Sequence, residues 1–209
     1  MIKERVVSNS ETTLNLPVLT REDIEARARS VREKFGLKSI PINPLTIAER
    51  VDIAVNNAKF FRESVAGAIA RSGNKVVLLV NQSDAPYRKR FTIAHELGHY
   101  FLHLHGDGEF IDKEVNLFRQ PKGDPNGWTP VQRAEYQANM FAAALLMPED
   151  AVQKAWDETA SLERLAREFN VSEQAMGIRL DQMGLLDEEK GREGKVAISF
   201  HKSVTAGWA

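Results

Sequence analysis

Two histidines and a glutamate near the middle of the chain are arranged to hold a metal ion and to move a proton. His95 and His99 lie four residues apart in the stretch "AHELGHY", so on a helix both imidazoles occupy one face and can reach one ion. Glu96 lies too far round the helix to be the preferred ligand, but it can contact a metal-bound water and accept its proton. Zinc lowers the pKa of such a water to about 7, which makes a nucleophile available at neutral pH.

A helix with two buried, hydrogen-bonded histidines would show the same five-residue motif without any metal. The residues around the motif therefore have to decide between the two interpretations. A catalytic zinc ion needs a third protein ligand and one open position, and three residues of this chain compete for that role.

Two of the three candidates are later histidines of the same segment. His105 occupies the last position of the pattern H-E-x-x-H-x-x-G-x-x-H, but the glycine of that pattern is Leu102 here. Without a turn at Leu102, His105 points away from the other two histidines. His103 lies one turn after His99 and would overshoot the ion, so we expect it beside the site.

Glu135, in the stretch "AEYQANMFAAALLMP", is the favoured third ligand. It heads the apolar stripe of a predicted helix, where a carboxylate needs a cation nearby. Small residues such as Ala138 allow this helix to approach the histidine helix closely, and Asn139 can hydrogen-bond near the site. The alternative is that Glu135 only favours the positive end of its own helix, which is worth about 0.3–1 kcal/mol. The sequence favours a site made of His95, His99 and Glu135.

The helix that carries the histidines is predicted to be buried. Apolar residues cover most of its circumference, namely Phe91, Ile93, Ala94, Leu97, Tyr100, Phe101, Leu102 and Leu104. Gly98 lies between the two histidines along this helix and costs roughly 1 kcal/mol relative to Ala. We expect it to let another backbone approach beside the metal.

The composition excludes several other kinds of chemistry. The 209 residues contain no cysteine, so disulfides, thiolate zinc sites and cysteine catalysis are all excluded. Lys and Arg number 28 against 29 Asp and Glu, and the net charge of -1 argues against a chain that coats nucleic acid or an anionic membrane. No apolar run approaches the ~20 residues that span a bilayer. The N-terminus also lacks the apolar core of a signal peptide, so we expect a cytoplasmic protein.

The remaining elements predict a small sheet before the histidine helix and further helices after it. In chain order they are a helix over 20–36, a short helix from Pro44, a strand within 51–61, a hairpin over 66–81, a helix from Thr129 that stops at Pro148, and two helices divided at 170–172. The apolar run 76–80 is typical of a strand covered on both faces.

The pair "RKRFTIAHELGHYFLH" and "EYQANMFAAALLMP" resembles the ImmA/IrrE family of metallopeptidases. The resemblance runs from about residue 20 to residue 186, and the two motifs together are far more specific than H-E-x-x-H alone. It implies zinc held by His95, His99 and Glu135, with Glu96 as general base. Such a site also accepts manganese or another divalent ion. The resemblance further implies a protein substrate, a helix-turn-helix repressor that is cut once; some members are instead paired with such a repressor as toxin and antitoxin.

The segment "LERLAREFNVSEQAMGIRLDQMGLL" has the rhythm of a helix-turn-helix, which makes DNA binding a rival function. Residues 161–190 contain four basic and seven acidic side chains, a net charge of -3, and this is the wrong sign for neutralising phosphates. We therefore expect this helix pair to pack on the peptidase core and not to bind nucleic acid directly.

The predicted fold is α+β, with a zincin-like helical core, a small and mainly antiparallel sheet, and a C-terminal helix pair. We expect an N-terminal arm over 1–19, a zinc metallopeptidase domain over 20–150, the helix pair over 151–190 and a tail over 191–209. The expected function is zinc-dependent cleavage of a protein substrate. Two rivals remain open, a toxin or regulator that acts by binding and a DNA-binding regulator.

Overall fold

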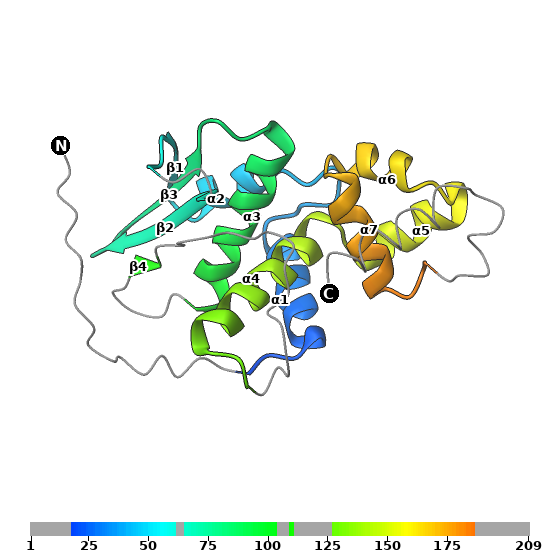
Figure 1. The fold of residues 1–209 in the computed structure, drawn as a ribbon, viewed down its shortest axis with the longest axis horizontal. Helices are drawn as coiled ribbons and strands as arrows, with labels where there is room; N and C mark the ends of the chain where they lie inside the picture. The colour runs from blue at the N-terminus through cyan, green and yellow to red at the C-terminus, as the bar shows by residue number, and fades with distance from the viewer. Residues whose placement is uncertain (1–17, 62–64, 104–108, 111–126, 187–209) are drawn as a thin grey trace.

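The computed structural model describes residues 18–61, 65–103, 109–110 and 127–186. Its helices are α1 (Arg21–Lys34), α2 (Pro44–Arg50), α3 (Pro86–Leu102), α4 (Pro130–Leu146), α5 (Glu149–Thr159), α6 (Leu162–Phe169) and α7 (Glu173–Gln182). Its strands are β1 (Ile53–Ala58), β2 (Gly67–Ser72), β3 (Lys75–Asn81) and β4 (Glu109–Phe110). The sheet lies at one end of the molecule, α5 to α7 lie at the other end, and α1, α3 and α4 lie between them (Figure 1). This confirms the predicted α+β class.

The small sheet has the strand order β1-β3-β2-β4, with one parallel pair and two antiparallel pairs. β2 and β3 form the predicted hairpin, which turns at Gly73 with a positive φ of 59°. Val76, Leu78 and Val80 of β3 are buried, whereas the alternate residues Val77 and Leu79 are only half-buried. The prediction of a strand covered on both faces was wrong, because β3 lies in a mixed sheet with full cover on one face.

The two helices that carry the predicted site begin differently. α4 starts at Pro130 with a capping box, in which Thr129 and Gln132 each accept a hydrogen bond from the backbone N–H of the other. α3 also starts with a proline, Pro86, but its N-cap is Ala85 and no side chain caps the helix there. The stability of α3 therefore comes mainly from burial, since ten of its residues are buried.

The C-terminal part contains the predicted helix pair, α6 and α7. Ser161 and Ser172 cap the two helices, and Asn170 ends α6 in the left-handed conformation with a φ of 52°. The structure adds α5, which the sequence analysis did not predict. Only Val152 and Ala155 of α5 are buried, so its apolar stripe is too narrow to stand out in the sequence.

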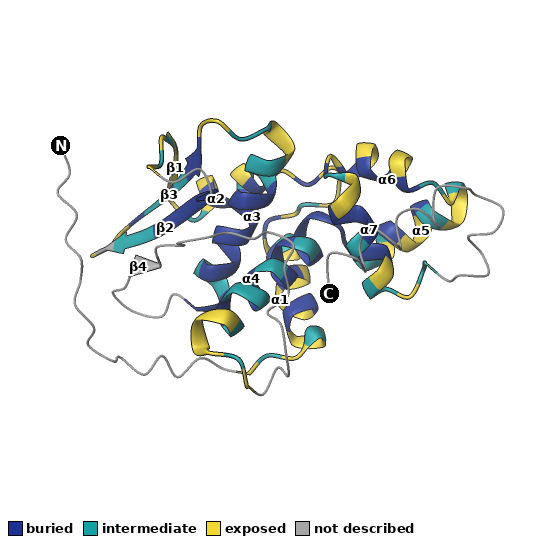
Figure 2. Cartoon of the chain, viewed as in Figure 1, coloured by how far each residue is buried: buried dark blue, intermediate teal, exposed yellow. Residues whose placement is uncertain are grey.

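A buried ion pair joins α7 to the core. Arg179 is fully buried and donates two hydrogen bonds to the carboxylate of Glu25 on α1, at 2.5 and 3.1 Å. Its Nε donates to the carbonyl oxygen of Met147, just after α4, at 2.9 Å. Figure 2 shows the resulting pattern, with the buried side of the late helices turned toward the rest of the molecule and their exposed side turned outward.

Several predictions concern segments outside the described residues. These are most of the N-terminal arm over 1–19, the tail over 191–209, and the position of His105. Among the helices in the described ranges, none combines the length and the apolar character that crossing a bilayer requires.

Candidate metal centre

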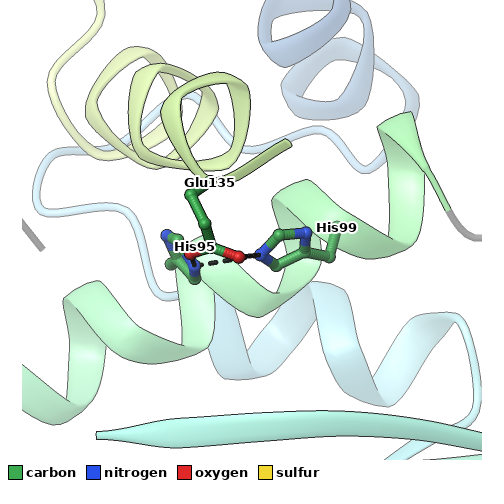
Figure 3. A group of neighbouring side chains, drawn as sticks. All are labelled: His95, His99 and Glu135. Carbon is green, nitrogen blue, oxygen red and sulfur yellow. Dashed lines mark hydrogen bonds and ion pairs between the residues drawn. The ribbon is translucent and has the colours of Figure 1, made fainter. Parts of the chain in front are cut away.

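His95, His99 and Glu135 come together between α3 and α4 (Figure 3). The Nε2 atoms of His95 and His99 are 3.0 Å apart. Each also lies 3.3 Å from one carboxylate oxygen of Glu135. The structure thus brings together three residues that are predicted as ligands, from two helices separated by a long stretch of chain.

The spacing of these atoms suits a zinc ion. Four ligands placed tetrahedrally at zinc–nitrogen and zinc–oxygen distances of 2.0–2.2 Å are about 3.3–3.6 Å from one another. The three separations here, 3.0, 3.3 and 3.3 Å, are close to that value before any ion draws the ligands into place. Glu135 keeps a side-chain exposure of 26%, whereas both histidines are buried.

Asn139 sets the protonation of His95. The side-chain oxygen of Asn139 lies 2.9 Å from Nδ1 of His95, and because an amide oxygen can only accept, Nδ1 carries the proton. The other nitrogen, Nε2, then carries a lone pair that faces Glu135 and His99. The prediction that Asn139 hydrogen-bonds near the site is confirmed, and this arrangement is typical of a metal-ligating histidine.

The charge on Glu135 also fits a ligand role. Burial acts to raise the pKa of Glu135, but the interactions with the nearby rings of His95 and His99 outweigh it and hold the pKa below its usual value. The carboxylate is therefore ionised at neutral pH, as a metal ligand must be.

A close contact between two helix backbones sets the distance from Glu135 to the histidines. A Cβ atom on Gly98 would lie 3.0 Å from both the Cα and the carbonyl oxygen of Ala138. A Cβ atom here would force Ala138 to move by a few tenths of an ångström, so glycine permits the close approach that was predicted for Gly98 and the small residue Ala138. The contact lies beside the site, since Gly98 precedes His99 and Ala138 is one turn after Glu135.

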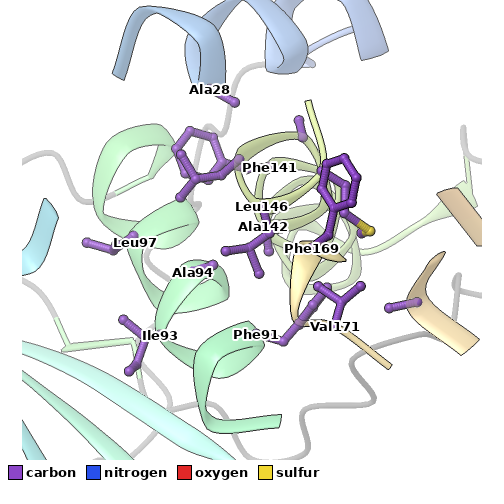
Figure 4. Packing of buried hydrophobic residues seen from close by; sticks show 14 of the residues in the cluster. Ala28, Phe91, Ile93, Ala94, Leu97, Phe141, Ala142, Leu146, Phe169 and Val171 are labelled. Atoms are coloured by element: carbon purple, nitrogen blue, oxygen red, sulfur yellow. The ribbon is translucent and has the colours of Figure 1, made fainter. Parts of the chain in front are cut away.

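Apolar packing holds α3 and α4 at this short distance (Figure 4). Phe91, Ala94 and Leu97 of α3 and Phe141, Ala142 and Leu146 of α4 are all buried in one cluster with Ala28 of α1 and Phe169 of α6. Full burial of one large apolar side chain contributes about 1.5–3 kcal/mol, so the cluster can support polar groups that are costly to bury.

The IrrE N-terminal-like domain family matches residues 48–181, well over half of the chain. The matched region contains both histidines, Glu96 and Glu135. The chain belongs to the ImmA/IrrE family. The resemblance inferred from the two sequence motifs is thereby confirmed.

Two curated relatives support the same assignment. Metallopeptidase ImmA of Bacillus subtilis (strain 168) is 30% identical over 108 residues, which make up 51% of this chain and 57% of that protein. Radiation response metalloprotease IrrE of Deinococcus radiodurans is 31% identical over 100 residues, or 46% of this chain and 28% of that protein. The chain thus matches less than two thirds of the length of either relative.

A solved structure shares the fold of this ImmA/IrrE-family chain. It is a Mycobacterium tuberculosis transcriptional regulator, with a TM-score of 0.53 and 17% sequence identity over 77% of this chain and 46% of that one. At this identity the likeness shows a common fold alone.

Glu96 lies on the side of α3 that faces β2. It is fully buried, and a Cβ atom on Gly67 of β2 would lie 3.0 Å from its Oε1 atom and 2.4 Å from Cγ2 of Thr92. Gly67 therefore allows β2 to lie against the predicted general base. Gly67 could not be predicted, because no local pattern in the sequence distinguishes it from other strand glycines.

His103 lies beside the three candidate ligands and not among them, as expected. Its Nδ1 atom is 3.1 Å from Nδ1 of His99, and its Nε2 atom is 2.8 Å from the side-chain oxygen of Gln137. Burial and the nearby His99 lower the pKa of His103 to about 4, so the ring is neutral at physiological pH. Gln137 is 1% exposed and was missed by the sequence analysis; a glutamine on the apolar side of a helix was the available signal.

Proposed function

We propose that this chain is a metal-dependent endopeptidase that uses zinc bound by His95, His99 and Glu135. The observation that carries the proposal is the convergence of these three ligand atoms at 3.0–3.3 Å in a chain of the ImmA/IrrE family. Two relatives, the metallopeptidase ImmA and the radiation response metalloprotease IrrE, support the same reaction class. A His/His/Glu site also accepts manganese and other divalent ions, so zinc is the first ion to test.

A bound zinc ion would supply Lewis acidity, which polarises the peptide carbonyl and acidifies water. The chain itself would move the proton. The carboxylate of Glu96 accepts a proton from the attacking water and delivers it to the amide nitrogen that leaves. Its burial between α3 and β2 keeps bulk water away and orients the carboxylate. Asn139 holds the ring of His95 so that Nε2 stays available as a ligand.

The substrate that we propose is a helix-turn-helix repressor, cut once. This follows from the family resemblance, which now rests on a family match over 48–181. We also propose that residues 20–150 form the peptidase unit and that the later helices help to dock the substrate. The exposed residues of α6 and α7 suit such a surface, because they are polar and charged, namely Glu163, Arg164, Arg167, Glu168, Glu173, Gln174 and Asp181.

DNA binding through α7 is disfavoured by the structure. Arg179, the one arginine of α7, is fully buried and bonded to Glu25, so it cannot reach a phosphate. The basic residues at the start of α3 are also engaged within the chain. Arg88 pairs with Asp84 at 3.3 Å, and Arg90 donates to the carbonyl oxygens of Ile42 and Asn170.

The test mixes the zinc-loaded protein with the repressor-like protein encoded nearest its gene. Wild type and Glu96→Gln are compared, and the products are weighed by mass spectrometry. We expect one new cut that only wild type makes. A stable complex without cleavage would favour a toxin held by its antitoxin, and cleavage by both proteins would refute the role of Glu96.

A further inference from the structure

A run of hydrogen bonds leads from Gln137 on α4 through His103 to the candidate ligand His99. Gln137 Oε1 lies 2.8 Å from His103 Nε2, and His103 Nδ1 lies 3.1 Å from His99 Nδ1. All three side chains are buried, with exposures of 1%, 4% and 1%. The side of the His99 ring that faces away from Glu135 is thus held by a second histidine.

The direction of these hydrogen bonds follows from the groups involved. An amide oxygen can only accept, so Gln137 Oε1 requires a proton on Nε2 of His103. A neutral imidazole has one N–H, so Nδ1 of His103 must accept. Nδ1 of His99 therefore donates to Nδ1 of His103, and Nε2 of His99 carries a lone pair. That lone pair faces Glu135 at 3.3 Å and His95 at 3.0 Å.

The hydrogen bonds from Gln137 through His103 to His99 could also run in the opposite direction. If Gln137 turned its amide nitrogen toward His103, Nε2 of His103 would accept and Nδ1 would donate to His99. The proton of His99 would then lie on Nε2, and a protonated nitrogen cannot bind a metal. The orientation of one buried amide thus selects between a ligand and a non-ligand form of His99.

We infer that Gln137 and His103 are positioning residues, which fix the tautomer and ring orientation of His99 and thereby raise the affinity for the metal. They do for His99 what Asn139 does for His95. The usual partner of a ligating histidine is a carboxylate, a backbone carbonyl or water, and here a histidine and a glutamine together take that place. The inference rests on the proposed metal-dependent function.

Zinc affinity gives the first test, measured by competition with a chromophoric chelator at constant pH. Gln137→Met keeps the size of the side chain but has no oxygen acceptor, and we expect its dissociation constant for zinc to rise about 10–100-fold. Gln137→Glu keeps an oxygen and has no NH2 group, so it should bind zinc nearly as tightly as wild type. Gln174→Met, an exposed change on α7, is the matched control. Equal affinity in Gln137→Met and wild type would overturn the inference.

Nuclear magnetic resonance of the zinc-loaded wild type gives a second test that needs no variant. The ¹⁵N shifts of the imidazole rings report which nitrogens carry protons. We expect the proton of His99 on Nδ1 and that of His103 on Nε2. A proton on Nδ1 of His103 would overturn the inference even if Gln137→Met failed to fold.

The two proposals fail in different ways. If wild type binds no zinc, the proposed function fails. If wild type binds zinc and cleaves its substrate while Gln137→Met binds zinc just as tightly, only the positioning role fails.

Discussion

The helix pairs α3–α4 and α6–α7 both bury polar side chains, but they do so with opposite results. Between α3 and α4, two Nε2 atoms and a carboxylate face one another at 3.0–3.3 Å, and Glu135 remains partly exposed. At α7, the guanidinium of Arg179 is enclosed, with hydrogen bonds to Glu25 and to the carbonyl oxygen of Met147. The first arrangement leaves ligand atoms directed at a common point, whereas the second directs its polar atoms at each other.

The role of a buried polar residue thus depends on whether its partners lie within the protein. Buried groups whose partners lie within the protein hold two elements together (a tether), so removing one of them lowers the free energy of unfolding. Buried groups that direct lone pairs and a carboxylate at one point need a cation there, so removing one of them lowers the affinity for the metal and the rate of cleavage. Substitutions in the two regions should therefore have separable effects.

Glu135→Ala should have the largest effect, because it removes one of three proposed protein ligands. We expect the variant to retain no stoichiometric zinc after dialysis and to lose cleavage, a loss greater than the roughly 10–100-fold that follows removal of an outer partner. Metal content by atomic emission checks this. Glu22→Ala, on the exposed side of α1, is the control. If His105→Ala lost the metal and Glu135→Ala kept it, Glu135 would not be the third ligand.

Glu96→Gln should separate chemistry from metal binding within α3. The amide cannot accept the proton, so we expect cleavage to fall about 10²–10⁴-fold while zinc content stays at the wild-type level. Cleavage is followed by mass spectrometry, and metal content is measured on the same sample. Wild-type cleavage by this variant would contradict the mechanism.

Arg179→Met should affect stability and leave the metal centre intact. It leaves the carboxylate of Glu25 buried without its cation, which costs about 3–5 kcal/mol in the free energy of unfolding. Urea denaturation measures the loss. Combining it with Glu25→Leu should restore most of the stability, whereas Arg167→Met, in an exposed pair with Glu163, should cost at most about 1 kcal/mol. Reduced zinc affinity in folded Arg179→Met would contradict the separation of the two regions.

Gly98→Ala should weaken the approach of α3 to α4. The added methyl would lie 3.0 Å from backbone atoms of Ala138, and overpacking of this kind costs about 1–3 kcal/mol. The helix preference of alanine offsets about 1 kcal/mol of that cost. Zinc affinity should also fall, since Glu135 moves away from the histidines. Adding Ala138→Gly should restore little, because two of the three close atoms belong to the backbone. Unchanged affinity would show that the contact does not set the site.

Lowering the pH should weaken the cap of α1, the helix that supplies Glu25 to the tether. Hydrogen bonds from Thr20 lower the pKa of Asp23 in the folded protein. A carboxyl group whose pKa is lower in the folded protein than in the unfolded chain stabilises the fold at pH values above its pKa in the unfolded chain. This contribution is lost as the pH falls through its pKa in the folded protein. Urea denaturation of wild type and Asp23→Asn between pH 6 and 3 should show a steeper loss for wild type. Parallel curves would contradict the role of the cap.

Local patterns predicted most of the candidate site. The four-residue spacing in "AHELGH", the glycine inside it and the alanines and Asn139 of the second helix led to the ligand set, the close backbone contact and the hydrogen bond to His95. The N-terminal caps at Thr20 of α1 and Thr129 of α4 could also be predicted from the sequence. Each of these depends on residues within one or two turns of a helix, where spacing alone decides which side chains are neighbours.

Other features depended on contacts between distant parts of the chain. Gln137 meets His103 across 34 residues, and Arg179 meets Glu25 across 154. Nothing near Gln137 in sequence marks it as a partner of a histidine, and Arg179 counted as a surface charge until its burial was known. The narrow apolar stripe of α5 likewise could not be identified as a buried face from the sequence alone.

The sequence was enough to predict the candidate ligands, their helical spacing, the family and the α+β class, because these follow from local geometry and from motif identity. Only the folded structure revealed the hydrogen-bond partners of His95, His99 and His103, the close fit of Gly67 against Glu96, and the burial of the one arginine on α7. The physical reason is that a proton's position and a charge's cost depend on the atoms that surround them, and packing brings those atoms from remote parts of the chain.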